Sequence, residues 1–353
     1  MLARILTTVV ALAIGAAGGT LFYSLHLPLP WTLGAITTAS IVAIAGRPWL
    51  LKAPARNFVR PVVGVLAGSS FTAELLARIA DWWPAILLLI AYALIMLFIG
   101  YVFFRVTAGF DRATAFFASA PGGLGELTLL GSALGGDMRR LVLVHLIRIL
   151  TVIFTVPIAL QLYLGHPIGR TALGASTGAA LTLRDWIVLI LCGLVGYALS
   201  HRLRFPAGPM MFPLILSMIV HVTGFTEASP PPWLVAVVQV VLGAVIGARL
   251  SGIRWRDTRK VLLVGTAWAA IMLVMAAVAA CFGAWLLDRP FEGVLLALAP
   301  GGMVEMSIIT YALGIDVAFV VTCQLTRILF VLLITPLVFR VIGKPASGPG
   351  AST

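Results

Sequence analysis

Long apolar segments recur along nearly the whole chain, with polar residues confined to short intervals between them. Each segment is long enough to cross a hydrocarbon core of about 30 Å as a helix. This pattern predicts an all-α, polytopic membrane protein without a soluble domain. The expected crossings are residues 4–25, 29–46, 57–76, 83–105, 139–164, 184–203, 208–225, 233–250, 261–287 and 317–340. A tail at 344–353 is rich in Gly, Pro, Ala and Ser, and we expect it to be disordered.

One unusual polar interruption occurs twice. Residues 121–137 read PGGLGELTLLGSALGGD and residues 300–316 read PGGMVEMSIITYALGID, and 8 of these 17 positions are identical at a shift of 179. Arg148-Ile149-Leu150 matches Arg327-Ile328-Leu329 at the same shift. The chain is therefore predicted to be a duplication, with repeat 1 at 1–170 and repeat 2 at 183–343, joined by a connector of small residues.

Loop charges indicate that the two repeats have opposite orientations. The loop 46–61 carries four basic residues and its counterpart 221–232 carries none, whereas 249–260 carries five and its counterpart 71–83 carries one. Lys and Arg favour the cytoplasmic side, so matching loops should face opposite sides. Inversion requires an odd number of crossings in each repeat. We therefore expect about five transmembrane helices per repeat, plus a re-entrant hairpin or broken helix at 111–136 and at 290–315.

Composition agrees with a membrane location. The chain is 61% hydrophobic and 10% charged, with mean hydropathy +1.10. Most of the 24 Lys and Arg residues fall in loops assigned to the cytoplasm, as do both chain ends. The net charge of +12 then reflects topology and attraction to anionic lipids, and it requires no nucleic-acid partner.

Four charged residues resist placement at a membrane edge: Glu126, Glu305, Arg148 and Arg327. A charge at the centre of a spanning helix costs about 2.5–3.5 kcal/mol on insertion scales, so such residues usually serve a purpose. Two compatible interpretations remain open. The residues form structural ion pairs, Glu126–Arg148 and Glu305–Arg327, or they line a central cavity in which Glu binds a proton or cation and Arg binds an anion.

The Pro-Gly-Gly triplets supply the geometry for such a site. Proline ends a helix and glycine permits a sharp change of direction. Half-helix ends aimed at the bilayer midplane can hold ions or charged groups of a substrate. If the repeats are inverted, the two hairpin tips should meet near the midplane. The candidate substrate- or ion-binding residues are Pro121, Gly122, Gly123, Glu126, Arg148, Pro300, Gly301, Gly302, Glu305 and Arg327.

The sequence offers only weak signals for a proton relay, a metal site or a catalytic site. His145 lies one turn before Arg148 and Gln324 occupies the matching position, so the pair is a candidate proton relay, although an interior packing role is the simpler interpretation. The histidines and cysteines show no metal-ligand spacing, and no nucleotide or nucleophile motif occurs. We expect no metal, no cofactor and no enzymatic activity.

The twin motifs PGGLGELTLLGSALGGD and APGGMVEMSIITYALGID, with RIL following each, resemble the membrane AbrB family of bacteria. Members are also labelled ammonia monooxygenase or AbrB family transcriptional regulator. The resemblance implies an inverted-repeat secondary transporter, multi-pass in the bacterial inner membrane. We expect it to carry a small polar or charged solute, coupled to protons or cations through Glu126 and Glu305. The alternative is a membrane sensor that affects gene expression indirectly. Expected partners are the small-molecule or ion substrate and membrane lipids; a homodimer stays open.

Overall fold

The computed structural model describes residues 2–45, 54–77, 79–165, 168, 181–203, 205, 208–251 and 255–342. Within these residues the secondary structure is helical throughout, and no strand occurs. Six helical segments are long and apolar enough to cross a membrane, and five shorter apolar helices accompany them. The protein is thus an all-α, polytopic membrane protein. The tail 344–353 and most of the connector lie outside the described residues.

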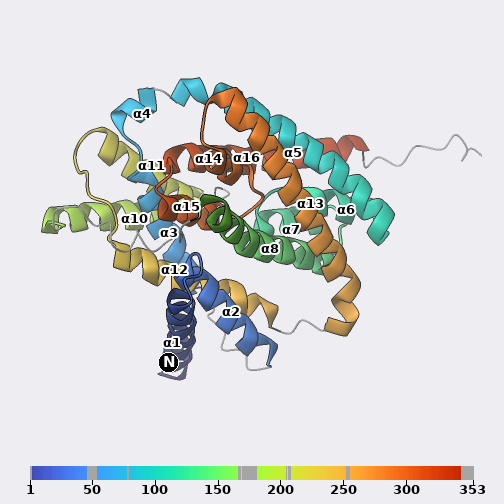
Figure 1. Ribbon diagram of the computed structural model, residues 1–353, viewed down its shortest axis with the longest axis horizontal. Coiled ribbons are helices and arrows are strands. Elements are labelled where there is room, and N and C mark those ends of the chain that lie inside the picture. The colour runs from blue at the N-terminus through green and yellow to red at the C-terminus, as the bar shows by residue number, and fades with distance from the viewer. Residues whose placement is uncertain are drawn as a thin grey trace, which may run out of the picture.

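Each of the ten predicted crossings corresponds to a helix (Figure 1). In the first half these are α1 (Leu2–Ser24), α2 (Pro30–Ile44), α3 (Pro54–Gly68), α5 (Trp83–Phe103) and α8 (Met138–Leu164). In the second half they are α10 (Leu183–Leu203), α11 (Gly208–Val222), α12 (Pro232–Gly247), α13 (Trp255–Leu287) and α16 (Val317–Ile342). Short connecting elements are α4 (Ala73–Ala77), η1 (Ile79–Trp82), η2 (Phe104–Ala108) and η3 (Ala248–Leu250).

A pair of half-helices stands where each hairpin was predicted. The first pair is α6 (Arg112–Ser119) and α7 (Leu124–Ala133), and the second is α14 (Phe291–Leu298) and α15 (Met303–Leu313). Both pairs break at Pro-Gly-Gly, where the flanking backbone turns to extended ψ angles of 129° to 146°. The half-helices of the two pairs begin at the same shift of 179, so the duplication extends to the order of elements. Opposite orientation of the repeats stays a prediction.

Glycine pairs bring helices of different halves into backbone contact. A Cβ added at Gly64 or Gly68 of α3 would overlap carbonyl oxygens of α11. A Cβ at Gly243 or Gly247 of α12 would likewise crowd carbonyl oxygens of α2. Such G-x-x-x-G faces allow close helix packing in membranes. Helices α3 and α12 occupy matching positions in the two repeats. Each repeat therefore packs this helix against a helix of the other repeat.

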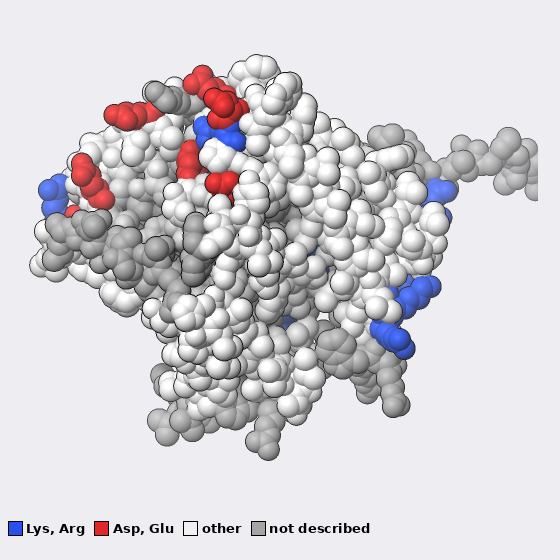
Figure 2. Space-filling model, viewed as in Figure 1, with Lys and Arg blue, Asp and Glu red and all other residues white. Residues whose placement is uncertain are grey.

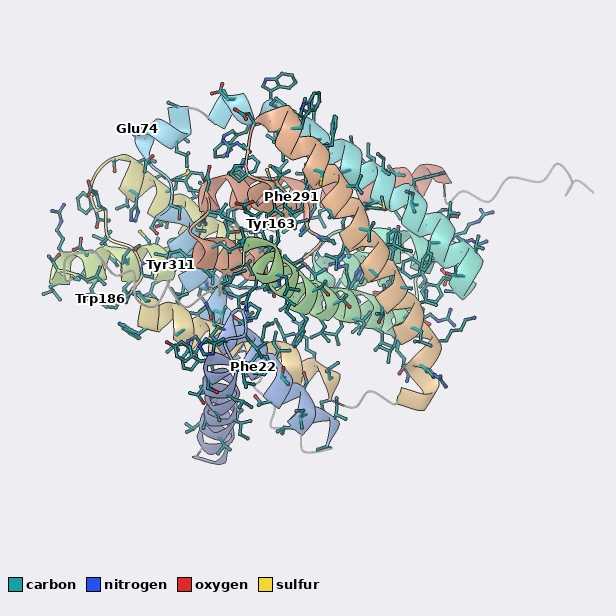
Figure 3. The ribbon with its side chains drawn as sticks, in the orientation of Figure 1. Phe22, Glu74, Tyr163, Trp186, Phe291 and Tyr311 are labelled. Atoms are coloured by element: carbon teal, nitrogen blue, oxygen red, sulfur yellow. The ribbon has the colours of Figure 1, made fainter. Side chains whose placement is uncertain are left out.

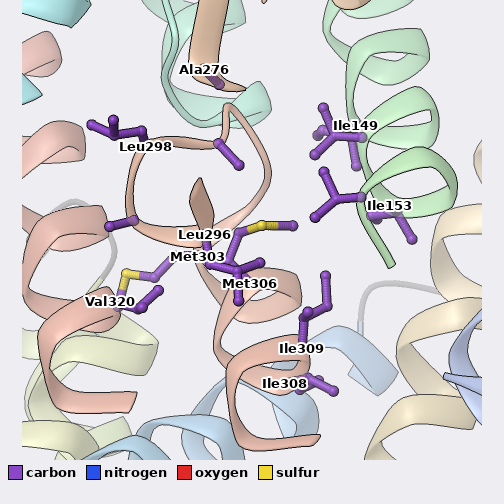
Figure 4. Packing of buried hydrophobic residues seen from close by; sticks show 14 of the residues in the cluster. Ile149, Ile153, Ala276, Leu296, Leu298, Met303, Met306, Ile308, Ile309 and Val320 are labelled. Atoms are coloured by element: carbon purple, nitrogen blue, oxygen red, sulfur yellow. The ribbon is translucent and has the colours of Figure 1, made fainter. Parts of the chain in front are cut away.

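The second hairpin packs against α8 of the first half. In Figure 4, Ile309 of α15 faces Ile153 of α8, within one continuous hydrophobic core. At the far end of α8, the ring of Tyr163 lies 5.5 Å from that of Phe291 at the start of α14 (Figure 3). These contacts fix the position of the break in α14–α15 relative to the first half.

Surface charges separate along the molecule. Figure 2 shows most acidic side chains gathered at the end that carries α4 and η1, with a few basic ones among and beside them, and only basic side chains at the opposite end, near the end of α5 and the start of α13. Surface without charged residues lies between the two ends in this view. A protein that crosses a membrane requires an uncharged band between its two polar ends.

Candidate functional site

Two buried arginines cap the broken helices. Arg148, on α8, is 1% exposed and donates from Nη1 to the carbonyl oxygen of Ala120 (3.0 Å) and from Nη2 to that of Gly122 (2.6 Å). These carbonyls are left without helical partners by the Pro-Gly-Gly break. A cation at the C-terminal end of a helix also complements its dipole. The guanidinium therefore satisfies backbone groups that lipid cannot.

The second half repeats this arrangement atom for atom. Arg327, on α16 and 1% exposed, donates to the carbonyl oxygens of Ala299 and Gly301, which match Ala120 and Gly122 at the shift of 179. Its Nη2 also donates to Oε1 of Gln324 (2.6 Å), whose Nε2 donates to the carbonyl oxygen of Leu296 (2.7 Å). Gln324 thus helps hold the end of α14.

The alternative of structural Glu126–Arg148 and Glu305–Arg327 ion pairs is wrong for this structure. Among the described residues, ion pairs join Arg140 to Asp137 and Arg289 to Asp316, and neither buried arginine takes part. The physical reason is that the guanidinium Nη groups already bind backbone carbonyls.

Each glutamate lies in the first turn of the second half-helix, three residues after its N-cap glycine. A Cβ added at Gly123 would overlap Oε2 of Glu126, and one at Gly302 would overlap Oε2 of Glu305. The carboxylates therefore fold back over the breaks. A negative charge at a helix N-terminus gains about 0.3–1 kcal/mol from the dipole. Both side chains are half-buried.

One cavity of about 120 Å³ joins the two breaks. Glu126 with Gly122 and Gly123 lines it from the first half, and Glu305 with Gly302 lines it from the second. Charged groups on its wall also include Arg60 of α3, Arg148 and Arg249 of η3. The remainder is apolar, contributed by α3, α7, α8, α11, α12, α15 and α16: Val59, Leu124, Leu146, Ile149, Met210, Leu242, Val245, Ile246, Met303, Val304 and Ile328.

Several candidate residues lie outside the lining of this cavity. Pro121, Pro300, Gly301, Arg327, His145 and Gln324 are buried and are not among its lining residues. His145 differs from Gln324 in its contacts, because neither of its ring nitrogens has a hydrogen-bond partner among the described residues. Nothing in these contacts connects the two residues in a relay.

The same three kinds of group, an arginine, an aspartate and an aromatic ring, meet where each hairpin begins and ends. In the first half Arg140 pairs with Asp137 (3.0 Å) and its Cζ lies 5.2 Å from the ring centroid of Phe110. In the second half Arg289 pairs with Asp316 (3.1 Å) and lies 4.2 Å from the ring of Phe319. At the shift of 179, Phe110 matches Arg289 and Arg140 matches Phe319. The cation and the ring have exchanged positions while the contact remains.

Sequence reasoning missed two residues of the site. The sequence pattern assigns Arg60 and Arg249 to cytoplasmic loops, because they fall in the basic intervals 46–61 and 249–260. Only the packing of α3 beside α12 brings them to one wall. Among the described residues no three His, Cys, Asp or Glu side chains lie close enough together to hold a metal ion.

Comparison with known proteins places the chain in a recognisable group. The family described as "Transition state regulatory protein AbrB" matches residues 31–343. The chain is 26% identical to "Uncharacterized protein YhjN" of Bacillus subtilis (strain 168), over 94% of this chain and 92% of that protein. It is 24% identical to "Putative regulator AbrB" of Escherichia coli (strain K12), over 92% of this chain and 93% of that protein.

Proposed function

The chain belongs to the AbrB family, and from that premise and the geometry of its central cavity we propose that it is a secondary transporter of a small polar or charged solute. Transport is coupled to protons or another cation through Glu126 and Glu305. The protein has no catalytic role. It lies in the bacterial inner membrane, where it crosses repeatedly.

The observation that carries this proposal is the shared cavity. Two broken helices from different halves bring one carboxylate each to the same wall. Transporters commonly bind substrate and coupling ions at such breaks, near the interface of two repeats. A carboxylate at this position can take up and release a proton as the cavity changes its access from one side of the membrane to the other.

Reconstitution tests the proposal. Uptake of a panel of metabolites added outside proteoliposomes would be measured with and without a pH or sodium gradient, for the wild type, Glu126→Gln and Glu305→Gln. We expect gradient-driven uptake in the wild type and its loss in both variants, with unchanged melting temperature. Glu74→Gln, on the exposed α4, is the matched control. Full gradient-driven uptake in both cavity variants would remove the glutamates as the coupling site.

Topology belongs to the same proposal. The basic end of the molecule faces the cytoplasm together with both chain ends, and the acidic end with α4 faces the periplasm (Figure 2). Single cysteines introduced at exposed positions of α4 should react with an impermeant reagent in intact cells. Cysteines at Arg259 or Lys260, near the start of α13, should react only after lysis. The reverse pattern would overturn this orientation.

A regulatory role is the second candidate, favoured by the names of the family and of the Escherichia coli protein. In that case the cavity binds a small ligand without moving it, and effects on gene expression are indirect. Ligand-dependent stabilisation of the purified protein, combined with no uptake of the same ligand by proteoliposomes, would favour this role over transport.

A further inference from the structure

Glu305 borders a second space besides the central cavity. This space is a narrow void with no room for a water molecule, and Leu29 and Thr32, at the start of α2, lie on its wall. Its other lining residues are Ile153, Leu242, Ile308 and Ile309. The central cavity, at about 120 Å³, has room for water. Glu305 therefore stands between a space that can be wet and one that is dry.

The cavity and the void approach Glu305 from different sides. The cavity wall extends to the ends of α3 and α12 that adjoin the basic intervals 46–61 and 249–260. Leu29 instead lies at the opposite end of α2 from the interval 46–61, and its N–H donates to the carbonyl oxygen of Ile168, beyond the C-terminal end of α8 (3.2 Å). The void therefore leads toward the side of the membrane that faces away from the basic loops.

Matching positions of the two repeats differ in whether they are open. An added Cβ at Gly64 would meet the carbonyl oxygen of Met210, and one at the matching Gly243 would meet that of Thr32, so Met210 and Thr32 occupy equivalent places. Met210 lines the central cavity, whereas Thr32 lines the void. The same place in the fold is thus open in one half and closed in the other.

The closed start of α2 carries two energetically unfavourable features. Leu29 is 1% exposed and has left-handed backbone angles (φ 43°, ψ 56°), which are unusual for a bulky residue and more so directly before a proline. Thr32 is 3% exposed, and its Oγ1 has no hydrogen-bond partner among the described residues. Strained backbone and unsatisfied polar groups of this kind gather at sites that change conformation or bind a ligand.

Gln161, near the end of α8, ties this segment to the other side of the void. Its Nε2 donates to the carbonyl oxygen of His26, between α1 and α2 (3.0 Å), and its Oε1 accepts from the N–H of Ile168 (3.4 Å). Ile168 in turn accepts from Leu29. Gln161 is half-buried, so water can replace its bonds when the helices separate.

We propose that Leu29–Thr32 is a gate on a second access path to Glu305, closed in this structure, and that Gln161 is the latch that holds it closed. When the start of α2 moves away from α8 and α15, the backbone of Leu29 can relax and the hydroxyl of Thr32 meets water or solute. Alternating access requires such a second path, on the side opposite the central cavity. This inference rests on the proposed transport function and supplies the second of its two access routes.

Cysteine labelling of the purified full chain in detergent measures opening without transport. Thr32→Cys would be treated with N-ethylmaleimide, and modification of each cysteine would be followed by mass spectrometry of its peptide. Native Cys323, which is buried in α16, reports unfolding in the same sample. We expect slow modification at position 32, and modification about tenfold faster there when Gln161→Ala removes both bonds of the latch. Modification of Cys323 should stay unchanged.

A control and a second measurement accompany this comparison. Thr223→Ala, just after α11, removes a hydroxyl that donates to carbonyls of that helix, and it should change neither rate. If Thr32→Cys does not fold, hydrogen exchange compares the wild type with Gln161→Ala at the amides of Thr32 and Leu33, which both donate to the carbonyl of Leu29. Faster reaction confined to this segment supports the gate. An unchanged rate there, or an equal rise at Cys323, overturns it.

Thr32→Val separates this inference from the proposed function. It removes an unsatisfied hydroxyl at nearly constant shape, so it should raise the melting temperature. Thr335→Val removes a hydroxyl that donates to the carbonyl of Val331, and should not raise it. Gradient-driven uptake should fall several-fold in Thr32→Val, because the open path loses its polar group.

Latch-dependent labelling without uptake of any solute would support the gate and remove the transport role. Wild-type uptake in Thr32→Val would support transport and overturn the gate at Thr32.

Discussion

At the scale of single residues, Arg148 and Arg327 explain how a helix can be broken inside a membrane. Each break leaves backbone carbonyls without their helical partners, and an unsatisfied carbonyl in an apolar interior is costly. Each arginine replaces the lost bonds with two charge-assisted ones, to Ala120 and Gly122 or to Ala299 and Gly301. The buried charge and the break therefore compensate each other.

Removal of one arginine should accordingly destabilise the protein. Arg148→Met removes both guanidinium bonds and leaves the carbonyl of Gly122 without a partner, at about 1–3 kcal/mol for an unsatisfied buried group, whereas the carbonyl of Ala120 still accepts from the N–H of Gly122. We expect a marked fall in melting temperature in detergent, and a smaller one for Arg148→Lys, which can reach only part of the arrangement. Arg340→Met, at the exposed end of α16, serves as control. A wild-type melting temperature in Arg148→Met would contradict the capping role.

The clusters at the hairpin ends allow an exchange experiment. Arg289→Phe removes a cation from Asp316 and from the rings of Phe319 and Trp82, and should cost about 0.5–2 kcal/mol from the ion pair and cation–π contacts together. Phe319→Arg alone places two cations together. The double variant recreates the first-half arrangement of ring and cation, so it should recover much of the stability. A double-mutant cycle of unfolding measures the coupling, and strictly additive losses would show that the two positions act independently.

At the scale of elements, contact between helix backbones decides how the helices assemble. Gly243 of α12 lies so close to α2 that an added Cβ would stand 2.6 Å from the carbonyl oxygen of Thr32. By contrast, a Cβ at Gly193 of α10 would meet only Val65, at 3.9 Å. Substitution by alanine should therefore destabilise the protein at Gly243 but not at Gly193.

Alanine scanning at these glycines makes the contrast measurable. Gly243→Ala should lose about 1–3 kcal/mol, because α2 and α12 must separate. Gly193→Ala should be neutral or gain up to about 1 kcal/mol from the better helix propensity of alanine. Melting temperature and monodispersity in detergent report both outcomes. Equal effects at the two positions would refute the close-contact explanation.

At the scale of the whole molecule, the two halves exchange packing partners. In the first half, α3 packs on α11 of the second, and α12 of the second half packs on α2 of the first through the equivalent glycines. Each repeat therefore has a helix whose glycine face is covered by a helix of the other repeat.

Division of the chain between residues 170 and 183 tests this dependence. Expressed alone, either half should be degraded or aggregated, because its G-x-x-x-G face has no partner. Expressed together, the halves should co-purify as a complex with a melting transition near that of the intact protein. A stable, monodisperse first half on its own would contradict the exchange.

Sequence reasoning reached the helices and the hairpins because both have local signals. Apolar length sets the crossings, and Pro-Gly-Gly marks the breaks at Pro121 and Pro300. It also singled out Glu126, Glu305 and the two buried arginines, since charge in an apolar segment is conspicuous. The partners of those arginines could not be read from the sequence, because backbone carbonyls leave no signature in it. Arg60 and Arg249 escaped for a related reason, since their proximity depends on helix packing and not on spacing along the chain.

The exchange of partners between halves also sets an order for biosynthesis. Helix α3 is complete at Gly68, and α11 begins only at Gly208, so roughly 140 residues must be added between them, which takes about 7–28 s at 5–20 residues per second. During that interval the glycine face of α3 lacks the helix that covers it in the complete fold. We therefore expect the nascent first half to be sensitive to membrane proteases until α11, complete at Val222, covers this face.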